Sequence, residues 1–172
     1  MMRKKPMLAY PVSDKPINYN HDIFMQPKLD GVRCLIQYNA GKVTAYSRTG
    51  KEWKNIDHIL FNLKPWFALN PDVILDGELY NHDLRDNFEK IISLVRKTKP
   101  QPEDRVESAE NVQFNCYDIV DESMTFAMRN EFIKQAVPRN HCVYHVNTVP
   151  VYDDVHAKAL HKVNLDNGYE GS

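Results

Sequence analysis

The sequence has few cysteines, and no two of them are close together. Cys34, Cys116 and Cys142 are the only three in 172 residues, and no C-x-x-C pair occurs. An odd number at wide spacing indicates neither a disulfide framework nor a cysteine-based zinc site. We therefore expect a reducing, intracellular environment.

Long apolar runs are also absent. The N-terminal stretch MMRKKPMLAYPVSDKP contains basic residues but not the apolar segment that secretory signals have. No later run approaches the roughly 20 apolar residues that a membrane-spanning helix needs. The sequence thus predicts neither a secretory signal nor a membrane span.

The chain lacks an excess of charge of either sign. Its 22 lysines and arginines balance 23 acidic residues, for a net charge of -1. Any nucleic-acid binding must therefore come from local patches rather than from the overall field. There is no internal repeat, no low-complexity tract and no P-loop pattern. A chain of this length is enough for one domain with a real core.

What the sequence does contain is a compact charged motif, Lys28-Leu29-Asp30-Gly31-Val32-Arg33, between two apolar runs. On a strand, Lys28 and Asp30 would project from the same face. Gly31 lets the backbone turn or approach a ligand closely, and Arg33 offers a planar fork suited to phosphate. The motif combines a possible nucleophile, a carboxylate and an anion-binding group. The same pattern is also typical of a strand end with a solvated charged face.

Apolar periodicity predicts strands that alternate with helices. The expected strands are 23–29, 33–38, 43–47, 73–80, 112–120 and 142–152, with a turn at 39–42 and a break at Pro150. The expected helices are 56–67, 83–97, one capped by Ser123 that ends before Pro138, and a last one from Asp153 or Asp154 to a stop at Asn167-Gly168.

The segments between these elements lead to the fold class. Residues 97–110 are interpreted as a polar connection that could include a helical turn. Within the irregular N-terminal segment, the apolar Met7–Tyr10 is expected to attach that segment to the domain. The first three strands are expected to form a meander, which favours an α+β fold over a doubly wound parallel sheet.

Two acids lie on the strongly apolar strand VILDGELY. Asp76 and Glu78 are two residues apart, so both point to one face of this strand. Carboxylates on a buried strand are costly unless they are paired or bound to a cation. The strand therefore predicts a partner for each acid.

Five segments occur in a fixed order along the chain: KLDGVR at 28–33, SRTGKEW at 47–53, LDGELY at 75–80, FNCYDIVD at 114–121 and YEGS at 169–172. In this order and spacing they resemble the adenylation (nucleotidyltransferase) domain of ATP-dependent DNA ligases, over nearly the whole chain. PMLA at 6–9 resembles the lead-in of short phage-type ligases. The resemblance implies an α+β, antiparallel-sheet, ATP-grasp-like domain with flanking helices.

The resemblance implies a role for each motif residue around the nucleotide. Lys28 would be the nucleophile that becomes adenylated. Gln26 and the backbone around Leu29 would lie against the adenine edge. Tyr117 would stack on the adenine ring, although Phe114 is an alternative stacking residue and Tyr117 could instead belong to the core.

The charged motif residues would serve the phosphates and a metal. The resemblance implies that Arg33 and Arg48 contact ribose, phosphate or the 5′-phosphate of a nick. Glu78 would hold a ribose hydroxyl or a metal-bound water, and Glu170 would be the second metal-binding acid. The resemblance thus implies ATP and Mg²⁺ as cofactors, with both glutamates as metal-binding residues.

The chemistry explains why these groups belong together. A lysine amine can hold an activated phosphate as a phosphoramidate. Free lysine has a pKa of about 10.4, so it must lose a proton before it can attack. Mg²⁺ beside the lysine and the triphosphate would favour the neutral amine and stabilise the charge that develops on the α-phosphate. Carboxylates such as Glu78 and Glu170 supply the hard oxygens that this ion prefers.

The resemblance also implies partners and a setting. The partners would be ATP and nicked duplex DNA, with no membrane, and the protein would be a monomer. The setting would be the cytoplasm of a bacterium or an infected host cell, with a role in phage DNA replication, repair or recombination.

The match to the family pattern ends at the E-G motif. Residues 1–20 are interpreted as a lead-in segment and residues 21–172 as a partial adenylation domain. In the family pattern, further strands with paired lysines and an oligonucleotide-binding (OB) barrel follow, whereas this sequence ends at Ser172. We expect weak ATP binding, poor self-adenylation and no nick sealing from these residues alone.

Alternatives remain at this stage. An RNA ligase or a capping-type nucleotidyltransferase would share the motif lysine. A non-catalytic nucleotide- or nick-binding fragment would fit the loss of the later motifs. The modest basic patch of Lys90, Arg96, Lys97 and Lys99 is interpreted as a solvated helix end.

Overall fold

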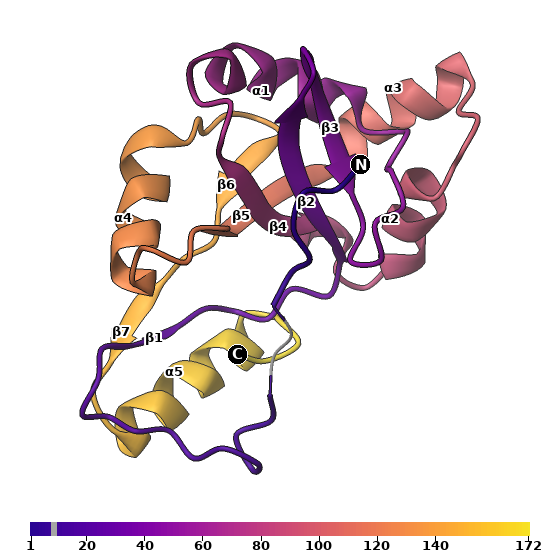
Figure 1. Ribbon diagram of the computed structural model, residues 1–172. Coiled ribbons are helices and arrows are strands. Elements are labelled where there is room, and N and C mark those ends of the chain that lie inside the picture. Colours follow the sequence, from indigo (N-terminus) through magenta and orange to yellow (C-terminus); the bar gives the residue numbers. More distant parts are fainter. Residues whose placement is uncertain (8–9) are drawn as a thin grey trace.

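The computed structural model describes residues 1–7 and 10–172 (Figure 1). A five-stranded sheet has the order β3-β2-β4-β5-β6, and a separate two-stranded sheet pairs β1 with β7. The strands are β1 Ile23–Met25, β2 Val32–Asn39, β3 Lys42–Tyr46, β4 Ile74–Tyr80, β5 Gln113–Ile119, β6 Val143–His145 and β7 Val149–Val151. The helices are α1 Asp57–Leu69, the 3₁₀ turn η1 His82–Leu84, α2 Phe88–Val95, α3 Pro102–Asn111, α4 Phe126–Ala136 and α5 Asp154–Asp166.

The five-stranded sheet is antiparallel except at one edge. The pairs β2–β3, β2–β4 and β4–β5 are antiparallel, and only β5–β6 is parallel. The turn between β2 and β3 has positive φ at Ala40 (47°) and Gly41 (83°). Positive φ at two successive turn residues gives the backbone twist that a two-residue hairpin needs. The predicted hairpin after the lysine motif is confirmed.

The two faces of this sheet differ in character. One face carries apolar side chains such as Ile36, Leu75 and Leu79, which form the core with α1, α2 and α4. The opposite face carries Arg33 paired across from Glu78 on β4. Helices therefore cover the apolar face, and the polar face is left for a site.

The first three strands do not form the predicted meander. The expected strand 23–29 ends at Met25, and β1 pairs with β7 rather than with β2. Pro27 has no N–H to donate to a ladder, so regular pairing cannot continue through it. Lys28 instead forms an isolated antiparallel bridge with Gly171.

The predicted helix over 83–97 is divided. Asn81 caps the short η1 by accepting a hydrogen bond from Asp83 N at 3.0 Å, and α2 begins only at Phe88. The apolar stripe of α2 faces the core through Ile91, Leu94 and Val95. The prediction that this apolar stripe belongs to the core is therefore confirmed, but the helix begins later than predicted.

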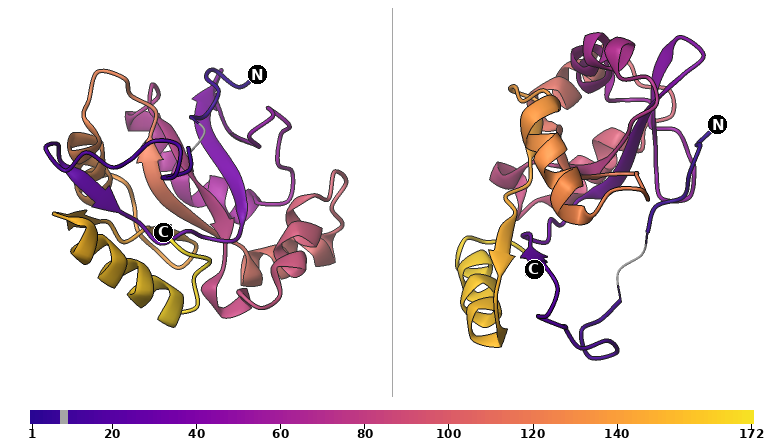
Figure 2. Two further views of the ribbon diagram at one scale, coloured as in Figure 1. Left: turned by 90° about the horizontal axis from the view of Figure 1, so that it is seen from below. Right: turned by 60° about the vertical axis from the view of Figure 1, so that its left-hand side comes forward.

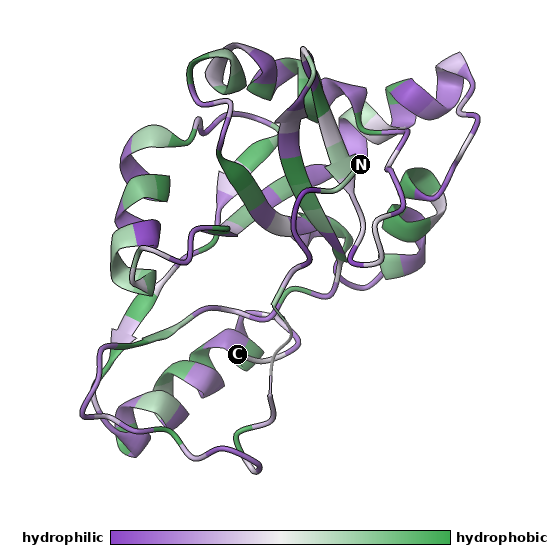
Figure 3. Cartoon of the chain, in the orientation of Figure 1, coloured by the Kyte–Doolittle hydropathy of each residue, from purple (hydrophilic) through white to green (hydrophobic). Residues whose placement is uncertain are grey.

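The predicted connection over 97–110 contains a complete helix, α3. Pro102 occupies its first turn, and Asp104 Oδ2 accepts from Gln101 N at 2.8 Å, as in a capping box. Most of α3 is hydrophilic in Figure 3, and Ser108 is its one buried residue. Apolar periodicity therefore gave no signal for this helix.

Two further boundaries differ from the predictions. The expected strand 142–152 is two strands in different sheets, β6 and β7. Thr125, rather than Ser123, caps α4 by accepting from Met128 N at 3.3 Å. The caps of α5 agree with prediction, because Asp153 accepts from His156 N and Gly168 has φ of 83°.

The N-terminal segment is attached by its first residues. Met1 O accepts from Gln37 Nε2 at 3.0 Å, Arg3 N donates to Gln37 Oε1 at 2.9 Å, and Lys4 contacts Glu122. Met7 is 72% exposed. The side chains of Met7 and Tyr10 therefore do not attach the segment, although Met7 O accepts from Arg33 Nη1. Leu8 and Ala9 lie outside the described residues, as does that part of the PMLA match.

The molecule has a main lobe, formed by the five-stranded sheet with α1–α4, and a small lobe, formed by β1, β7 and α5. Figure 1 and the right-hand view of Figure 2 show the small lobe below the main sheet. None of the thirteen residues of α5 is buried. No described helix is long and apolar enough to cross a membrane.

Candidate active site

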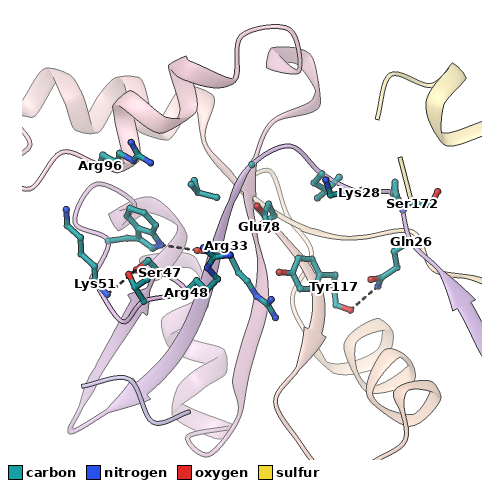
Figure 4. Close-up of a pocket in the computed structure, with 16 residues that line it drawn as sticks. Gln26, Lys28, Arg33, Ser47, Arg48, Lys51, Glu78, Arg96, Tyr117 and Ser172 are labelled. Carbon is teal, nitrogen blue, oxygen red and sulfur yellow. Dashed lines mark hydrogen bonds between the residues drawn. The ribbon is translucent and has the colours of Figure 1, made fainter. Parts of the chain in front are cut away.

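A cavity of about 960 Å³ lies over the polar face of the sheet (Figure 4). The predicted nucleotide-site residues Gln26, Lys28, Leu29, Arg33, Arg48, Glu78 and Tyr117 all line it. They come from the segment before β2, from β2 itself, from the β3–α1 loop, from β4 and from β5. The structure thus brings together seven residues that are spread over half of the chain.

Lys28 is held by the last residues of the chain. Its N–H donates to Gly171 O at 2.9 Å, and its carbonyl accepts from Glu170 N at 3.2 Å. Its Nζ lies 2.5 Å from Glu170 Oε1. The predicted metal-binding acid Glu170 therefore contacts the predicted nucleophile directly, although Glu170 itself is not part of the cavity wall.

Gly31 permits the lysine motif to lie close against β4. A Cβ at this position would come within 2.5 Å of Leu79 O and 2.6 Å of Glu78 Cγ. Real side chains essentially never make such approaches. Glycine is thus required here for close contact between two segments, as the sequence suggested.

Arg33 is paired with the acid on the neighbouring strand. Its Nε donates to Asp76 Oδ1 at 3.0 Å and its Nη2 to Asp76 Oδ2 at 2.6 Å. Nη1 donates to Met7 O at 2.6 Å. Burial raises the pKa of Asp76, and the Arg33 guanidinium opposes that rise. The predicted partner of Asp76 is therefore Arg33, whose fork is occupied in this structure.

Glu78 has no such pair. It lies partly buried between Arg33 and Tyr117 in Figure 4, and no salt bridge to it occurs among the described residues. Burial raises its pKa to about 8, with Arg33 opposing the rise and Asp76 adding to it. A carboxyl group in this condition favours a proton or a cation from outside the protein.

Tyr117 reaches the cavity because of a β-bulge. In the β4–β5 ladder, Asp76 pairs with Asp118 and Gly77 with Cys116, so Tyr117 is the extra residue. Bulges redirect side chains beside functional sites. Burial raises the pKa of the Tyr117 phenol. Tyr117 lines the cavity, whereas Phe114 is fully buried in the core and cannot stack on a ligand there.

Gln26 links the small lobe to this bulge. Its Nε2 donates to Tyr117 O at 3.0 Å and to Thr148 Oγ1 at 2.9 Å. These bonds fix the side chain at the cavity wall, on the same side as Lys28 and Ser172 in Figure 4.

Some residues of the cavity wall were not predicted from the sequence. Lys51 and Trp53 belong to the recognised SRTGKEW segment but received no role, and Arg96 was assigned to a solvated helix end. Arg96 lies 48 positions from Arg48 in the sequence and no periodicity connects them, so only the tertiary structure reveals their common cavity.

A metal site formed by the protein alone is not seen. Across residues 1–7 and 10–172, no group of three or more His, Cys, Asp or Glu side chains is arranged to hold a metal ion. Glu78 lines the same cavity as Lys28, and Glu170 contacts Lys28 from beside the cavity wall. Mg²⁺ commonly takes one or two carboxylates and completes its shell with substrate phosphates and water, so this donor set fits it.

Known proteins were compared with this chain and its structure. An African swine fever virus DNA ligase is 41% identical over 63 residues, which are 36% of this chain and 15% of that ligase. A Chlorella virus DNA ligase-adenylate structure has a TM-score of 0.66 at 18% identity, covering 97% of this chain and 57% of that one. An archaeal ATP-dependent RNA ligase has a TM-score of 0.64 at 16% identity, covering 99% of this chain and 44% of that one.

The matched segment thus covers only 15% of the viral relative, and the chain covers about half of these solved structures. The structural likeness establishes the fold and confirms the predicted α+β nucleotidyltransferase class. The family profile described as ATP dependent DNA ligase domain matches residues 6–172, which is nearly the whole chain. On that match, the chain belongs to the ATP-dependent DNA ligase family.

Proposed function

We propose that this chain is the nucleotide-binding, lysine-adenylating part of an enzyme that seals nicks in duplex DNA. One observation carries the proposal: the motif lysine Lys28 and the bulge residue Tyr117 line a single cavity that is otherwise rich in cations. A polyphosphate with a planar base matches these groups, because the ring offers a stacking surface and the cations offer charge.

Lys28 would attack the α-phosphate of ATP. A P–N bond forms to Nζ, and the bond from the α-phosphorus to the bridging oxygen breaks, which releases pyrophosphate. The ammonium must first lose a proton, and Glu170 Oε1 is the carboxylate oxygen in contact with it. We expect Glu170 to take that proton.

The adenosine would occupy the end of the cavity near Gln26 and Tyr117. Both hydrogen bonds of Gln26 use Nε2, so Oε1 is free to accept from the amino group of adenine. The Tyr117 ring would stack on the base, and Glu78 would meet the ribose. Arg48 would contact ribose, phosphate or the 5′-phosphate of the nick, and Arg33 would do so after releasing the Asp76 carboxylate or Met7 O.

Mg²⁺ is part of the proposal, with Glu78 and Glu170 as the residues that would hold it. When bound, the ion would neutralise charge on the triphosphate. A cation near Glu78 would also lower the pKa of this carboxyl group from its raised value and keep it ionised.

The proposal extends to organisation and setting. Residues 1–20 form a lead-in and residues 21–172 a partial adenylation domain that works with further sequence in the whole enzyme. The partner would be nicked duplex DNA, and the protein would be a monomer in the cytoplasm of a bacterium or an infected cell. Replication, repair and recombination are the processes that produce such nicks.

Labelling tests the lysine chemistry. The chain is incubated with Mg²⁺ and ATP labelled on its α-phosphate and then run on a denaturing gel. We expect slow, weak labelling that Lys28→Ala abolishes and that Lys64→Ala, a change at an exposed lysine on α1, leaves intact. Equal label in Lys28→Ala, or no label in the unchanged chain after long incubation, contradicts the proposal.

The RNA ligase fold likeness makes RNA joining the second candidate. The same labelling with GTP separates a capping-type enzyme from one that uses ATP. Transfer of the label from the protein to nicked DNA or to nicked RNA then separates the two ligase classes. The family match favours DNA.

A further inference from the structure

The cations of the cavity fall into two groups. Lys28 and Arg33 are already paired with carboxylates, as described above. Arg48, Lys51 and Arg96 also line the cavity, but in the described part of the chain none of them has a carboxylate oxygen within 4.0 Å. These three side chains are the cations available to a ligand.

The end of α2 shows that Arg96 is a distinct case among its basic neighbours. Lys90 contacts Glu107, and Lys97 lies 2.6 Å from Asp104, so both are neutralised by α3. Arg96 is the C-cap of α2 and faces the cavity in Figure 4. The basic patch that the sequence suggested is therefore divided, and one of its members faces the site.

The loop that carries the other two cations is well ordered by hydrogen bonds. Ser47 N donates to Lys51 O at 2.8 Å, and Lys51 N donates back to Ser47 Oγ at 3.0 Å. Gly50 closes the turn with φ of 85° and donates to Ser47 O at 2.9 Å. Trp53, 7% exposed, anchors the end of the loop in the core. A fixed loop presents Arg48 and Lys51 without a large ordering cost on binding.

The free cations lie apart from the nucleophile. In Figure 4, Arg96 and Lys51 are at one end of the cavity, and Lys28, Gln26 and Tyr117 are at the other. The volume of about 960 Å³ is near the upper end of the roughly 300–1,000 Å³ typical of small-ligand sites. A nucleotide at the lysine end thus leaves space and unneutralised charge at the far end.

We propose that Lys51 and Arg96 form an anion subsite for backbone phosphates of the DNA strand, next to Arg48 and separate from the nucleotide. The inference rests on the proposed function, because it takes the lysine end as the nucleotide site. Backbone phosphates suit the subsite because the overall charge of -1 provides no general attraction, so contacts must be local. The other source of phosphate chemistry is the triphosphate tail of ATP.

Duplex binding by the 172-residue chain tests the subsite. The probe is a fluorescent nicked duplex with a 5′-phosphate, and its anisotropy is followed at several salt concentrations. The double variant Lys51→Gln, Arg96→Gln should bind roughly tenfold more weakly and reduce the slope of log affinity against log salt by about 2, since each phosphate contact contributes about 0.9. Its affinity for ATP should be unchanged. Lys99→Gln, which removes one charge three residues from Arg96 and outside the cavity, is the control.

Each other outcome overturns the subsite. The subsite is wrong if the double variant binds the duplex as tightly as the unchanged chain, or if Lys99→Gln weakens binding equally. It is also wrong if the double variant loses affinity for ATP instead, a result that would assign the cations to the triphosphate tail. An unchanged chain that binds no duplex at low salt also overturns it. Lys28 labelling decides the proposed function independently, because it needs neither Lys51, Arg96 nor DNA. An unaltered unfolding midpoint in urea shows that the double variant remains folded.

Discussion

Asp76 and Glu78 lie on the same face of β4 but are stabilised differently. Asp76 has both oxygens bonded to Arg33, whereas Glu78 has no guanidinium of its own and a pKa raised to about 8. The pairing of Asp76 with Arg33 within the protein stabilises the fold. An acid left protonated near neutral pH is more typical of a position that meets a ligand.

The raised pKa of Glu78 predicts a pH-dependent stability. Unfolded, this glutamate ionises near pH 4.5; folded, it ionises near pH 8. The folded state therefore holds its proton more tightly, and stability is lost as the pH rises through this window. Without divalent cations, Glu78→Gln should match the unchanged chain at about pH 4 and exceed it by on the order of 1–3 kcal/mol at about pH 8.5. Urea unfolding measures this difference; a constant difference across the window would contradict it.

Gly31 provides a second test, of close contact rather than charge. Gly31→Ala should cost about 1–3 kcal/mol of unfolding free energy, because its Cβ overpacks against Leu79 O and Glu78. Gly41→Ala should cost about 1–2 kcal/mol through backbone strain alone, since no atom lies within 4 Å of its added Cβ. Only Gly31→Ala should reduce Lys28 labelling, because only there does the lysine segment move. Equal labelling in the two variants would show that the close approach does not position Lys28.

For single residues, the sequence predicts the chemical need of a side chain but not the residue that meets it. The sequence indicated that Asp76 needs a partner, because an acid on an apolar strand must be compensated. It could not identify Arg33, since that choice depends on the β2–β4 register. Arg96 was missed for the same reason: the fold of α2 and the β3–α1 loop decides which exposed cation faces the cavity.

The secondary-structure elements were predictable where local signals agree. The β2–β3 hairpin has alternating residues and a turn suited to positive φ, and α1 and α5 have apolar spacing or caps that mark them. The helix α3 has a proline in its first turn but no apolar stripe, so periodicity missed it. The small sheet was not predictable, because β1 and β7 are brought together only by the folded chain.

One histidine makes several contacts between η1 and the C-terminal segment. His82 Nδ1 lies 2.7 Å from Tyr80 Oη, Nε2 lies 3.0 Å from Asn167 O, and its ring centroid is 4.4 Å from that of Tyr169. These contacts lead directly to Glu170, which touches Lys28. His82 therefore supports the segment that carries Glu170, which contacts the proposed nucleophile.

Amide hydrogen exchange tests this positioning. His82→Ala should make the Lys28 and Glu170 amides, which bond across the Lys28–Gly171 bridge, exchange several-fold faster, since each lost hydrogen bond is worth about 1 kcal/mol. Lys28 labelling should slow in parallel. His141→Ala, a change at an exposed histidine, should leave exchange and labelling unchanged. Normal protection of both amides in His82→Ala would show that the bridge holds without the histidine.

The two lobes differ in how they are stabilised. The main lobe has a continuous apolar core between its sheet and α1, α2 and α4. The small lobe relies on a three-residue ladder and a helix with no buried residue, and Val155 and Val163 of α5 are 78% and 51% exposed. Gln26 and Lys28 follow β1, Ser172 follows α5, and all three line the cavity, so the small lobe adjoins one wall of the candidate site.

This asymmetry predicts that α5 opens before the main lobe unfolds. A helix of thirteen residues, none of which is buried, is marginal in water, and regions with few buried contacts open at low free energy. Amides of α5 should therefore exchange at urea concentrations where those of α1 remain protected. Trp53 and Trp66, the two tryptophans of the chain, both belong to the main lobe, so their fluorescence should report the later transition alone. Coincident loss of protection in α5 and α1, at the fluorescence midpoint, would instead mean that the lobes unfold as one unit, with Lys28 held in place by the whole domain.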